Sequence, residues 1–360
     1  MDKNTINVTK TFLPPIEEYI DYLKQLWESN QITNHGELVN KLENKLKNYL
    51  DVKYLFFIAN GTIGLQIAIK SLGLQGEIIT TPFSYVATTS SIVWEGCYPV
   101  FVDIDPRSLC IDPDRIEAAI TPKTSAILAT HVYGYPCEVE KIDMIAKKHK
   151  LKVIYDAAHT FGVNYKGSSL VSYGDISVLS FHATKLFHTV EGGALVTGDD
   201  EIAHTIKYMR NFGHKGTEMY WGLGVNGKNT EIHAAMGLCV FPHINEIIKS
   251  RCRVNNTYEK YLDKEKFDRP IVPSGTDYNY AYFPVIFKSE DELKSAVNVL
   301  NQNNIFPRRY FYPSLDTLPY IKSREMQISQ DISKRVLCLP CYHDLTNNEI
   351  MMIAKLINNI

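Results

Sequence analysis

One lysine of this chain has neighbours that favour a reactive amine over an ordinary solvated charge. Lys185 lies in the stretch "SFHATKLFHTVEGG", between apolar and aromatic flanks. Such flanks remove water from the amine and lower its pKa, which makes it a better nucleophile and base near neutral pH. Gly192 and Gly193 allow the backbone to approach closely at the same place. An ordinary solvated charge is the alternative, and the rest of the chain has to decide between the two.

A carboxylate precedes this lysine by one loop and one strand. Asp156 closes the apolar run "KVIYDAA", with small residues and then His159 behind it. An acid at the end of a strand can simply cap the next helix. It can also be a buried carboxylate that holds a positive partner, such as a protonated ring nitrogen.

Two glycine-containing turns suit a phosphate. Asn60-Gly61-Thr62 joins an apolar run to a helical pattern, and "GLGVNGKNTEIHAAMGL" opens a second helix. Backbone N–H groups and the helix dipole favour an anion at such places, although each turn can also be no more than a loop with an N-cap. Taken together, a phosphate cradle, a carboxylate for a ring nitrogen and a lysine for an aldehyde are the needs of pyridoxal phosphate.

The elements that would position these groups alternate between strand and helix. Short apolar runs predict strands at "EIITTP", "YPVFVDI", "SAILATHVYG", "KVIYDAA", "ISVLSF" and "GALVTG". Residues 113–120, "PDRIEAAI", and 138–150, "EVEKIDMIAKKHK", are the clearest helices between them. This alternation predicts an α/β fold with a mostly parallel sheet covered on both faces, with ligands at the carboxyl ends of the strands.

The two ends of the chain read differently. Two helical patterns precede the first strand, and a long helical stretch over residues 229–263 is expected to kink at Pro242. Beyond it, strands and helices suggest a smaller α+β unit. We therefore predict a large domain over residues 1–240 and, over residues 241–360, a long connecting helix with a small α+β domain.

Composition narrows the class of protein. The 360 residues are 45% hydrophobic and 22% charged, and 38 Lys and Arg nearly balance 40 Asp and Glu. Such a balance favours a small-molecule site and no nucleic acid or membrane partner. Seven scattered cysteines without a disulfide rhythm, no signal pattern and no long apolar run predict a cytoplasmic protein, and no metal site is expected.

The motifs resemble those of a known family. "NGTIGLQIAIKSLG", "TTPFSYVATTSSIVWEG", "VIYDAAHTFG", "SFHATKLFHTVEGGALVT", "GVNGKNTEIHAAMGL" and "YFYPSLDTLPY" occur in the order found in the DegT/StrS-type nucleotide-sugar aminotransferases. This resemblance implies the fold type I architecture of the aspartate aminotransferase superfamily. It adds a seven-stranded large-domain sheet, pyridoxal phosphate as cofactor and a homodimer with shared active sites.

The resemblance also implies roles for particular residues. Lys185 would bond to the cofactor aldehyde, Asp156 would pair with the ring nitrogen, and Tyr85 would stack on the ring. Gly61, Thr62 and Ser180 would hold the phosphate, Asn226 would reach it from the neighbouring subunit, and His159 would lie by the 3-hydroxyl. The residues expected near the substrate are His182, Glu191, Lys228 and Tyr312. Many relatives read Gly-x-Asn-Tyr-Arg where this chain has Gly224-Val225-Asn226-Gly227-Lys228, so Lys228 would act as a point charge.

The start "TKTFLPPIEEYIDYLKQLW" most resembles the subgroup that makes dTDP-4-amino-4,6-dideoxyglucose for bacterial surface polysaccharides such as O-antigen. The implied reaction moves an amino group from L-glutamate to a dTDP-4-keto-6-deoxyhexose. Two alternatives stay open: an aminotransferase for the 3-keto isomer, and a regulator that binds the cofactor without turnover. Lys185 argues against the related branch that carries histidine at this position and deoxygenates its substrate.

Overall fold

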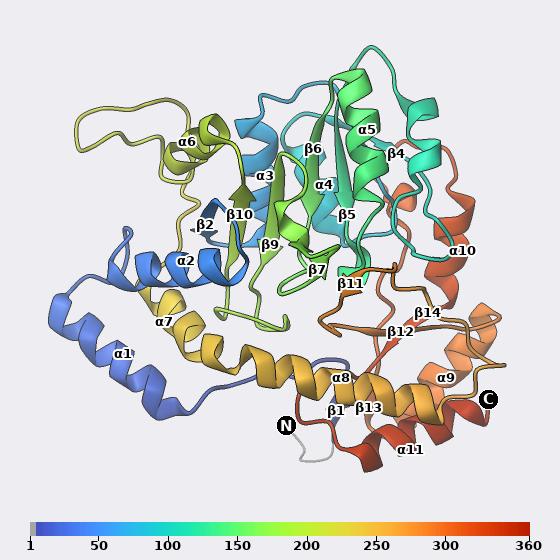
Figure 1. Ribbon diagram of the computed structural model, residues 1–360. Helices are drawn as coiled ribbons and strands as arrows, with labels where there is room; N and C mark the ends of the chain where they lie inside the picture. Colours follow the sequence, from blue (N-terminus) through green and yellow to red (C-terminus); the bar gives the residue numbers. More distant parts are fainter. Residues whose placement is uncertain (1–4) are drawn as a thin grey trace.

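The computed structural model describes residues 5–360 and is built around one seven-stranded sheet (Figure 1). Its strands are β2 (Tyr54–Ile58), β3 (Glu77–Thr80), β4 (Tyr98–Phe101), β5 (Thr124–Thr130), β6 (Lys152–Asp156), β9 (Ile176–Ser180) and β10 (Gly193–Thr197), in the spatial order β2-β10-β9-β6-β5-β3-β4. β10 runs antiparallel to both neighbours, and the other adjacent pairs are parallel. The predicted α/β fold with a mostly parallel seven-stranded sheet is confirmed.

Helices bury both faces of this sheet, as parallel strands require. α3 (Gly61–Ser71), α4 (Val86–Trp94) and α6 (Asp200–Met209) lie on one face, over side chains such as Val178. α2 (Glu37–Tyr49) and α7 (Glu231–Val240) cover the other face over Leu179, and α5 (Val139–His149) covers that face over Tyr155. Neighbouring strand residues thus enter different cores, because successive side chains of a strand point to opposite faces.

One predicted helix is wrong. Residues 113–120 form two 3₁₀ turns, Pro113–Arg115 and Glu117–Ala119, in place of an α-helix. Every backbone bond of this segment spans three residues, and Ile116 and Ala119, also three apart, are both buried. The tighter repeat puts both side chains on one side, and the segment is too short for α-helical pairing to outweigh that burial.

The long helical stretch is broken where proline predicts. α7 ends at Val240, a 3₁₀ turn covers Phe241–His243, and α8 runs over Ile244–Tyr261. The interruption expected at Pro242 is confirmed, and the predicted domain boundary at residue 240, which stays a prediction, falls at this break. α1 (Ile16–Ser29) and α2 both pack against α7.

The C-terminal part has its own small sheet and core. β12 (Phe283–Ile286) pairs antiparallel with β14 (Val336–Leu339), and the helices around them are α9 (Glu290–Gln302), α10 (Gln327–Arg335) and α11 (Asn347–Asn358). A three-stranded sheet of β7 (Asn164–Tyr165), β8 (Ser168–Ser169) and β11 (Thr276–Asp277) lies at its border with the large sheet.

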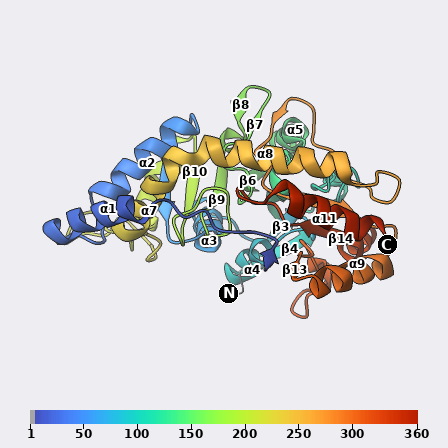
Figure 2. The ribbon, with the colours of Figure 1, turned by 90° about the horizontal axis from the view of Figure 1, so that it is seen from below.

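The N-terminal segment belongs spatially to this C-terminal part. β1 (Ile6–Asn7) pairs in parallel with β13 (Ile305–Phe306), and Ile6 is buried in the C-terminal core. Seen from below, the chain runs from β1, beside β13, across the molecule toward α1 (Figure 2). No helix among residues 5–360 is long and apolar enough to cross a membrane.

Candidate active site

A cavity of about 290 Å³ opens at the carboxyl ends of the parallel strands. Nine of the residues singled out from the sequence line it together: Gly61, Thr62, Tyr85, Asp156, His159, Ser180, His182, Lys185 and Glu191. They come from four separate stretches of chain, which the sheet topology brings to one edge. The position agrees with the rule that open α/β sheets bind ligands outside the carboxyl ends of their strands.

One end of the cavity is built for an anion. Asn60 caps α3 by accepting a hydrogen bond from the Ile63 N–H at 2.9 Å, so Gly61 and Thr62 form the first turn. The N–H groups of a first helical turn have no acceptor within the helix and carry the positive end of its dipole. Ser180, at the end of β9, adds a hydroxyl beside Gly61. The N-cap expected at this turn is confirmed, and the same cap exposes the backbone donors; phosphate binding at Gly61 and Thr62 stays a prediction.

The glycine pair permits this packing. A Cβ on Gly193 would lie 2.9 Å from the Gly61 nitrogen and 2.7 Å from the Leu179 carbonyl oxygen. Either contact is too short for a carbon atom, so only glycine lets β10 pass so close to the start of α3. The sequence expectation of close backbone approach is confirmed.

Lys185 has buried apolar neighbours, and its own side chain is partly exposed. The neighbouring Phe181, Leu186 and Phe187 are buried, and Nζ donates to the Tyr282 hydroxyl at 3.3 Å. Burial lowers the pKa of Lys185 to about 8, while the negative charge of Asp156 acts in the opposite direction. A substantial neutral fraction is therefore present near physiological pH, as the apolar flanks predicted.

Asp156 lies at the end of β6 with its carboxylate enclosed. One oxygen accepts from the Thr88 hydroxyl of α4 at 2.7 Å, and the other accepts from the Ala158 N–H at 3.2 Å. Burial raises the pKa of this carboxyl group, and the hydrogen bonds and the charge of Lys185 oppose that rise. A cationic ring nitrogen placed here would supply the close positive partner that the buried carboxylate lacks.

Aromatic rings form a second wall. His159 stacks on Phe311 at a centroid distance of 5.8 Å and meets the edge of Tyr282 at 4.8 Å. Burial lowers the pKa of His159 well below its usual value, so the imidazole is neutral. Within residues 5–360 its buried Nδ1 has no hydrogen-bond partner, which leaves one polar atom for a bound group.

The two histidines that flank Lys185 do different things. His182 lines the cavity and lies beside Glu191, with Nε2 at 3.6 Å from its carboxylate. His188 is buried, its Nδ1 accepts from the Val190 N–H, and its Nε2 donates to the Phe12 carbonyl at 2.6 Å. His188 therefore fastens the N-terminal segment to the lysine loop and has a structural role.

Three residues singled out from the sequence lie outside the cavity lining. Asn226 is exposed and accepts from Lys228 Nζ at 2.6 Å, and this ammonium sits 4.7 Å from the Phe212 ring centre. Tyr312 is half exposed and packs against the Arg309 guanidinium. The roles of all three, and of the residues in the cavity, stay predictions.

Several residues of the cavity lining were not predicted from the sequence. The additional lining side chains include Thr9, Thr130, Tyr282, Arg308, Tyr310 and Phe311. Thr130 ends β5 and could have been found by the strand-end rule. The stretch 308–311 carried no such signal, because it reaches the cavity only through the pairing of the C-terminal strands.

The model of the DegT/DnrJ/EryC1/StrS aminotransferase family matches residues 15–358. A dTDP-4-amino-4,6-dideoxy-D-glucose transaminase of Shigella dysenteriae is 44% identical over 99% of each chain. A crystal structure of DesI with its TDP-sugar product superposes with a TM-score of 0.94 at 30% identity, over 99% of this chain and 93% of DesI. NtdA of Bacillus subtilis, solved with bound cofactor PMP, gives 0.87 at 26% identity, over 96% and 82%.

Proposed function

Because the chain belongs to the DegT/DnrJ/EryC1/StrS aminotransferase family, we propose that it is a pyridoxal-phosphate-dependent nucleotide-sugar aminotransferase that makes dTDP-4-amino-4,6-dideoxy-D-glucose. L-Glutamate is the amino donor and dTDP-4-keto-6-deoxy-D-glucose the acceptor. The observation that carries the sugar assignment is the 44% identity, over nearly the whole of both chains, to a transaminase of that name. The resemblance read from the motifs is confirmed at the level of the family.

The residues in the cavity fit this cofactor. The first turn of α3 with Ser180 suits its phosphate, the enclosed Asp156 suits a protonated ring nitrogen, and Lys185 suits its aldehyde. The unpaired Nδ1 of His159 is placed to hydrogen-bond a ring substituent, and Tyr85 offers a flat exposed ring. When bound, pyridoxal phosphate supplies an aldehyde that accepts the amino group and a ring that stores electrons between the two half-reactions.

Lys185 is the proton carrier in this proposal. Its Nζ removes the proton from Cα of glutamate in the first half-reaction and delivers a proton to C4 of the sugar in the second. A pKa of about 8 suits both directions, because the amine can lose or gain a proton at little cost near neutral pH. The Tyr282 hydroxyl accepts a hydrogen bond from Nζ and so keeps the Lys185 side chain in the cavity. This single hydrogen bond leaves Nζ able to give up or take a proton.

Asp156 works through charge and not through proton transfer. Its two hydrogen bonds from Thr88 and Ala158 fix the carboxylate in the cavity lining. A carboxylate fixed in a low-dielectric site keeps a cationic ring nitrogen protonated, which is the form that withdraws electrons best.

A second copy of the chain completes the site in this proposal. The loop that carries Asn226 exposes a cluster of large apolar side chains, which are Phe212, Met219, Tyr220, Trp221, Leu223 and Val225. An apolar cluster of this kind on the surface suits a partner surface. We place Asn226 of one protomer at the phosphate end of the other protomer's cavity, which accounts for its position outside the cavity of its own chain.

The test is a product analysis. Purified protein supplied with pyridoxal phosphate, L-glutamate and dTDP-4-keto-6-deoxy-D-glucose should form an amino sugar whose mass and NMR couplings place nitrogen on C4. Nitrogen on C3, formed only from the 3-keto isomer, would favour the alternative aminotransferase. A visible cofactor band that glutamate does not bleach would favour the regulator and overturn the proposal.

A further inference from the structure

One cation in the cavity has no partner of its own. Arg308 lines the cavity, and within residues 5–360 no carboxylate or carbonyl oxygen lies within ion-pair or hydrogen-bond distance of its guanidinium. The next residue contrasts with it: the Arg309 guanidinium pairs with Glu290 at 3.0 Å and donates to the Ser333 and Lys334 carbonyls. Two adjacent arginines thus differ, one tied into the fold and one left open toward the cavity.

The backbone of Arg308 is held firmly although its side chain is open. Arg308 and Cys338 exchange two backbone hydrogen bonds, of 3.2 and 2.8 Å, which extend the β12–β14 sheet by one bridge. The guanidinium carbon lies 5.5 Å from the ring centre of Tyr310, close enough for a cation–π attraction. A rigid backbone and a neighbouring ring limit the freedom that the side chain would lose on binding a ligand.

The position of Arg308 decides which anion it suits. The phosphate end is formed by the large sheet, from the first turn of α3 and the end of β9, and it already supplies backbone donors. Arg308 comes from the C-terminal part, on the stretch that also brings Tyr310 and Phe311 to the cavity. An anion bound there would lie in the same cavity as Lys185, held by a different part of the chain from the one that forms the phosphate cradle.

We propose that Arg308 binds a carboxylate of the amino donor. The inference rests on the proposed function, since it assumes an amino acid as donor. The planar guanidinium fork matches a carboxylate with two parallel hydrogen bonds, which a lysine cannot provide. The interaction holds the donor so that its Cα faces Lys185, and it selects amino acids over simple amines.

A binding measurement distinguishes a role of Arg308 in holding the donor carboxylate from a general effect of its substitution on activity. The holoenzyme is titrated by calorimetry with glutarate, a dicarboxylate that has no amino group and cannot react. Arg308→Gln should weaken glutarate binding by about 10- to 100-fold, because a charged hydrogen-bonded pair is lost, and Arg308→Lys should fall between. Arg324→Gln, an exposed arginine outside the cavity lining, is the matched control and should bind like the wild type.

The half-reactions then identify the ligand. With glutamate alone, bleaching of the cofactor band by Arg308→Gln should require a correspondingly higher donor concentration, while the KM for the keto sugar stays within about twofold. A parallel loss with L-alanine as donor assigns the α-carboxylate, and a loss confined to glutamate assigns the side-chain carboxylate.

Three results would overturn the inference. Unchanged glutarate and glutamate affinity removes Arg308 from donor binding, a raised KM for the nucleotide sugar alone assigns it to the diphosphate, and lost cofactor content assigns it to the phosphate. Failure of the wild-type protein to bleach with any amino acid would instead remove the proposed function. The two failures are distinguishable because the second already shows in the wild-type protein.

Discussion

At the scale of single residues, the chemistry depends on the contrast between Lys185 and Asp156. Burial favours the neutral form of both groups: it raises the pKa of Asp156 and lowers the pKa of Lys185. Asp156 is compensated by two donors that keep the carboxylate in place. Lys185 has only the Tyr282 hydroxyl within residues 5–360, so its amine remains available.

The first prediction concerns the reaction. Lys185→Ala should lower the rate of amino transfer by about 10³-fold or more, because the amine that takes the Cα proton is lost. Tyr282→Phe should lower it only about tenfold, since the amine stays and loses one hydrogen bond. The rates are measured under saturating donor and acceptor, with cofactor content and circular dichroism as controls for folding. Full activity of Lys185→Ala would remove the assignment.

The second prediction concerns the pH dependence of stability in the cofactor-free protein. The pKa of Lys185 is about 8 when folded and 10.5 ordinarily, so between these values the unfolded chain binds more protons and stability rises with pH. Below pH 8 the buried ammonium therefore destabilises the fold. Lys185→Met should raise the free energy of unfolding at pH 7 by about 1–2 kcal/mol, a value reduced from the full shift because the side chain is partly exposed.

Urea titrations at several pH values check this prediction. The advantage of Lys185→Met over the wild type should shrink as the pH rises from 8 to 10.5, because the wild-type amine is then neutral in both states. A difference independent of pH would mean that the amine is not desolvated. Lys249→Met, at a lysine outside the cavity, is the control and should show no such trend.

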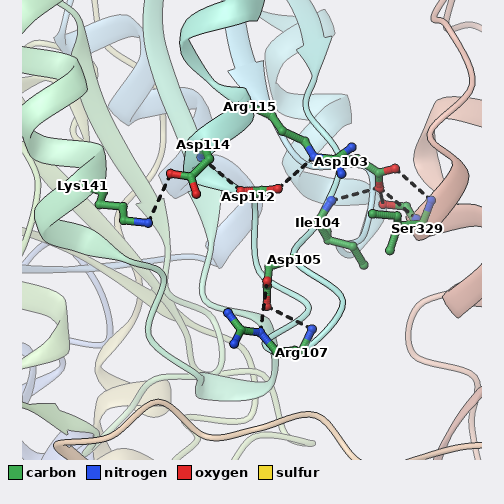
Figure 3. Close-up of polar contacts among 10 residues, drawn as sticks. Asp103, Ile104, Asp105, Arg107, Asp112, Asp114, Arg115, Lys141 and Ser329 are labelled. Carbon is green, nitrogen blue, oxygen red and sulfur yellow. Dashed lines mark hydrogen bonds and ion pairs between the residues drawn. The ribbon is translucent and has the colours of Figure 1, made fainter.

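At the scale of elements, one carboxylate ties the large sheet to the C-terminal part. Asp103 follows β4, and its oxygens accept from the backbone N–H groups of Ile328 and Ser329, each at 2.9 Å, and from the Ser329 hydroxyl at 2.6 Å (Figure 3). These N–H groups belong to the first turn of α10, which has no side-chain cap of its own. A remote acid therefore does the work of a helix cap.

The third prediction follows from this link. Asp103→Asn should lower the free energy of unfolding by about 1–2 kcal/mol, because the amide keeps one acceptor and loses the charge at the helix N-terminus. Ser329→Ala removes only the hydroxyl bond and should cost less. Chemical denaturation measures both. Asp112→Asn is the control, since Asp112 caps a local 3₁₀ turn on the same loop and does not reach α10 (Figure 3).

At the scale of the whole molecule, the cavity exists because distant parts of the chain meet. Contacts that hold the N-terminal segment include the β1–β13 pairing, the His188 bond to Phe12, and the Cys341 N–H that donates to the Val8 carbonyl. Thr9 of this segment lines the cavity. Residues near both ends of the sequence thus line a cavity whose proposed catalytic residues, Asp156 and Lys185, come from the middle of the sequence.

The fourth prediction tests whether active sites are shared between protomers. Asn226→Asp places a negative charge where the proposed dimer needs a phosphate ligand, so this variant and Lys185→Ala should each be inactive as homodimers. Mixing them after mild denaturation should restore about a quarter of wild-type activity, because half of the randomly formed dimers contain one intact site. No recovery, with mixed dimers verified by mass spectrometry, would mean that each protomer uses its own Asn226.

The sequence predicted those features that local patterns encode. Buried parallel strands are short apolar runs, and a proline such as Pro242 interrupts a helix in any context. Residues at strand ends, such as Asp156 and Ser180, lie at the edge of the sheet once the topology is known. Helix α4 was not predicted, because its hydroxyl and β-branched residues, Thr88 among them, favour helix weakly and are held by burial.

What only the tertiary structure decided is which distant groups share a space and a charge environment. Lys185 and its flanks could be read from the sequence, but its contact with Tyr282 and the depth of its desolvation depend on the C-terminal part folding over the sheet edge. Arg308 and Arg309 are neighbours of one type, and only the pairing with β14 and Glu290 separates an open cation from a structural one. Local pattern encodes elements, whereas burial and pairing arise from contacts that no short stretch of sequence contains.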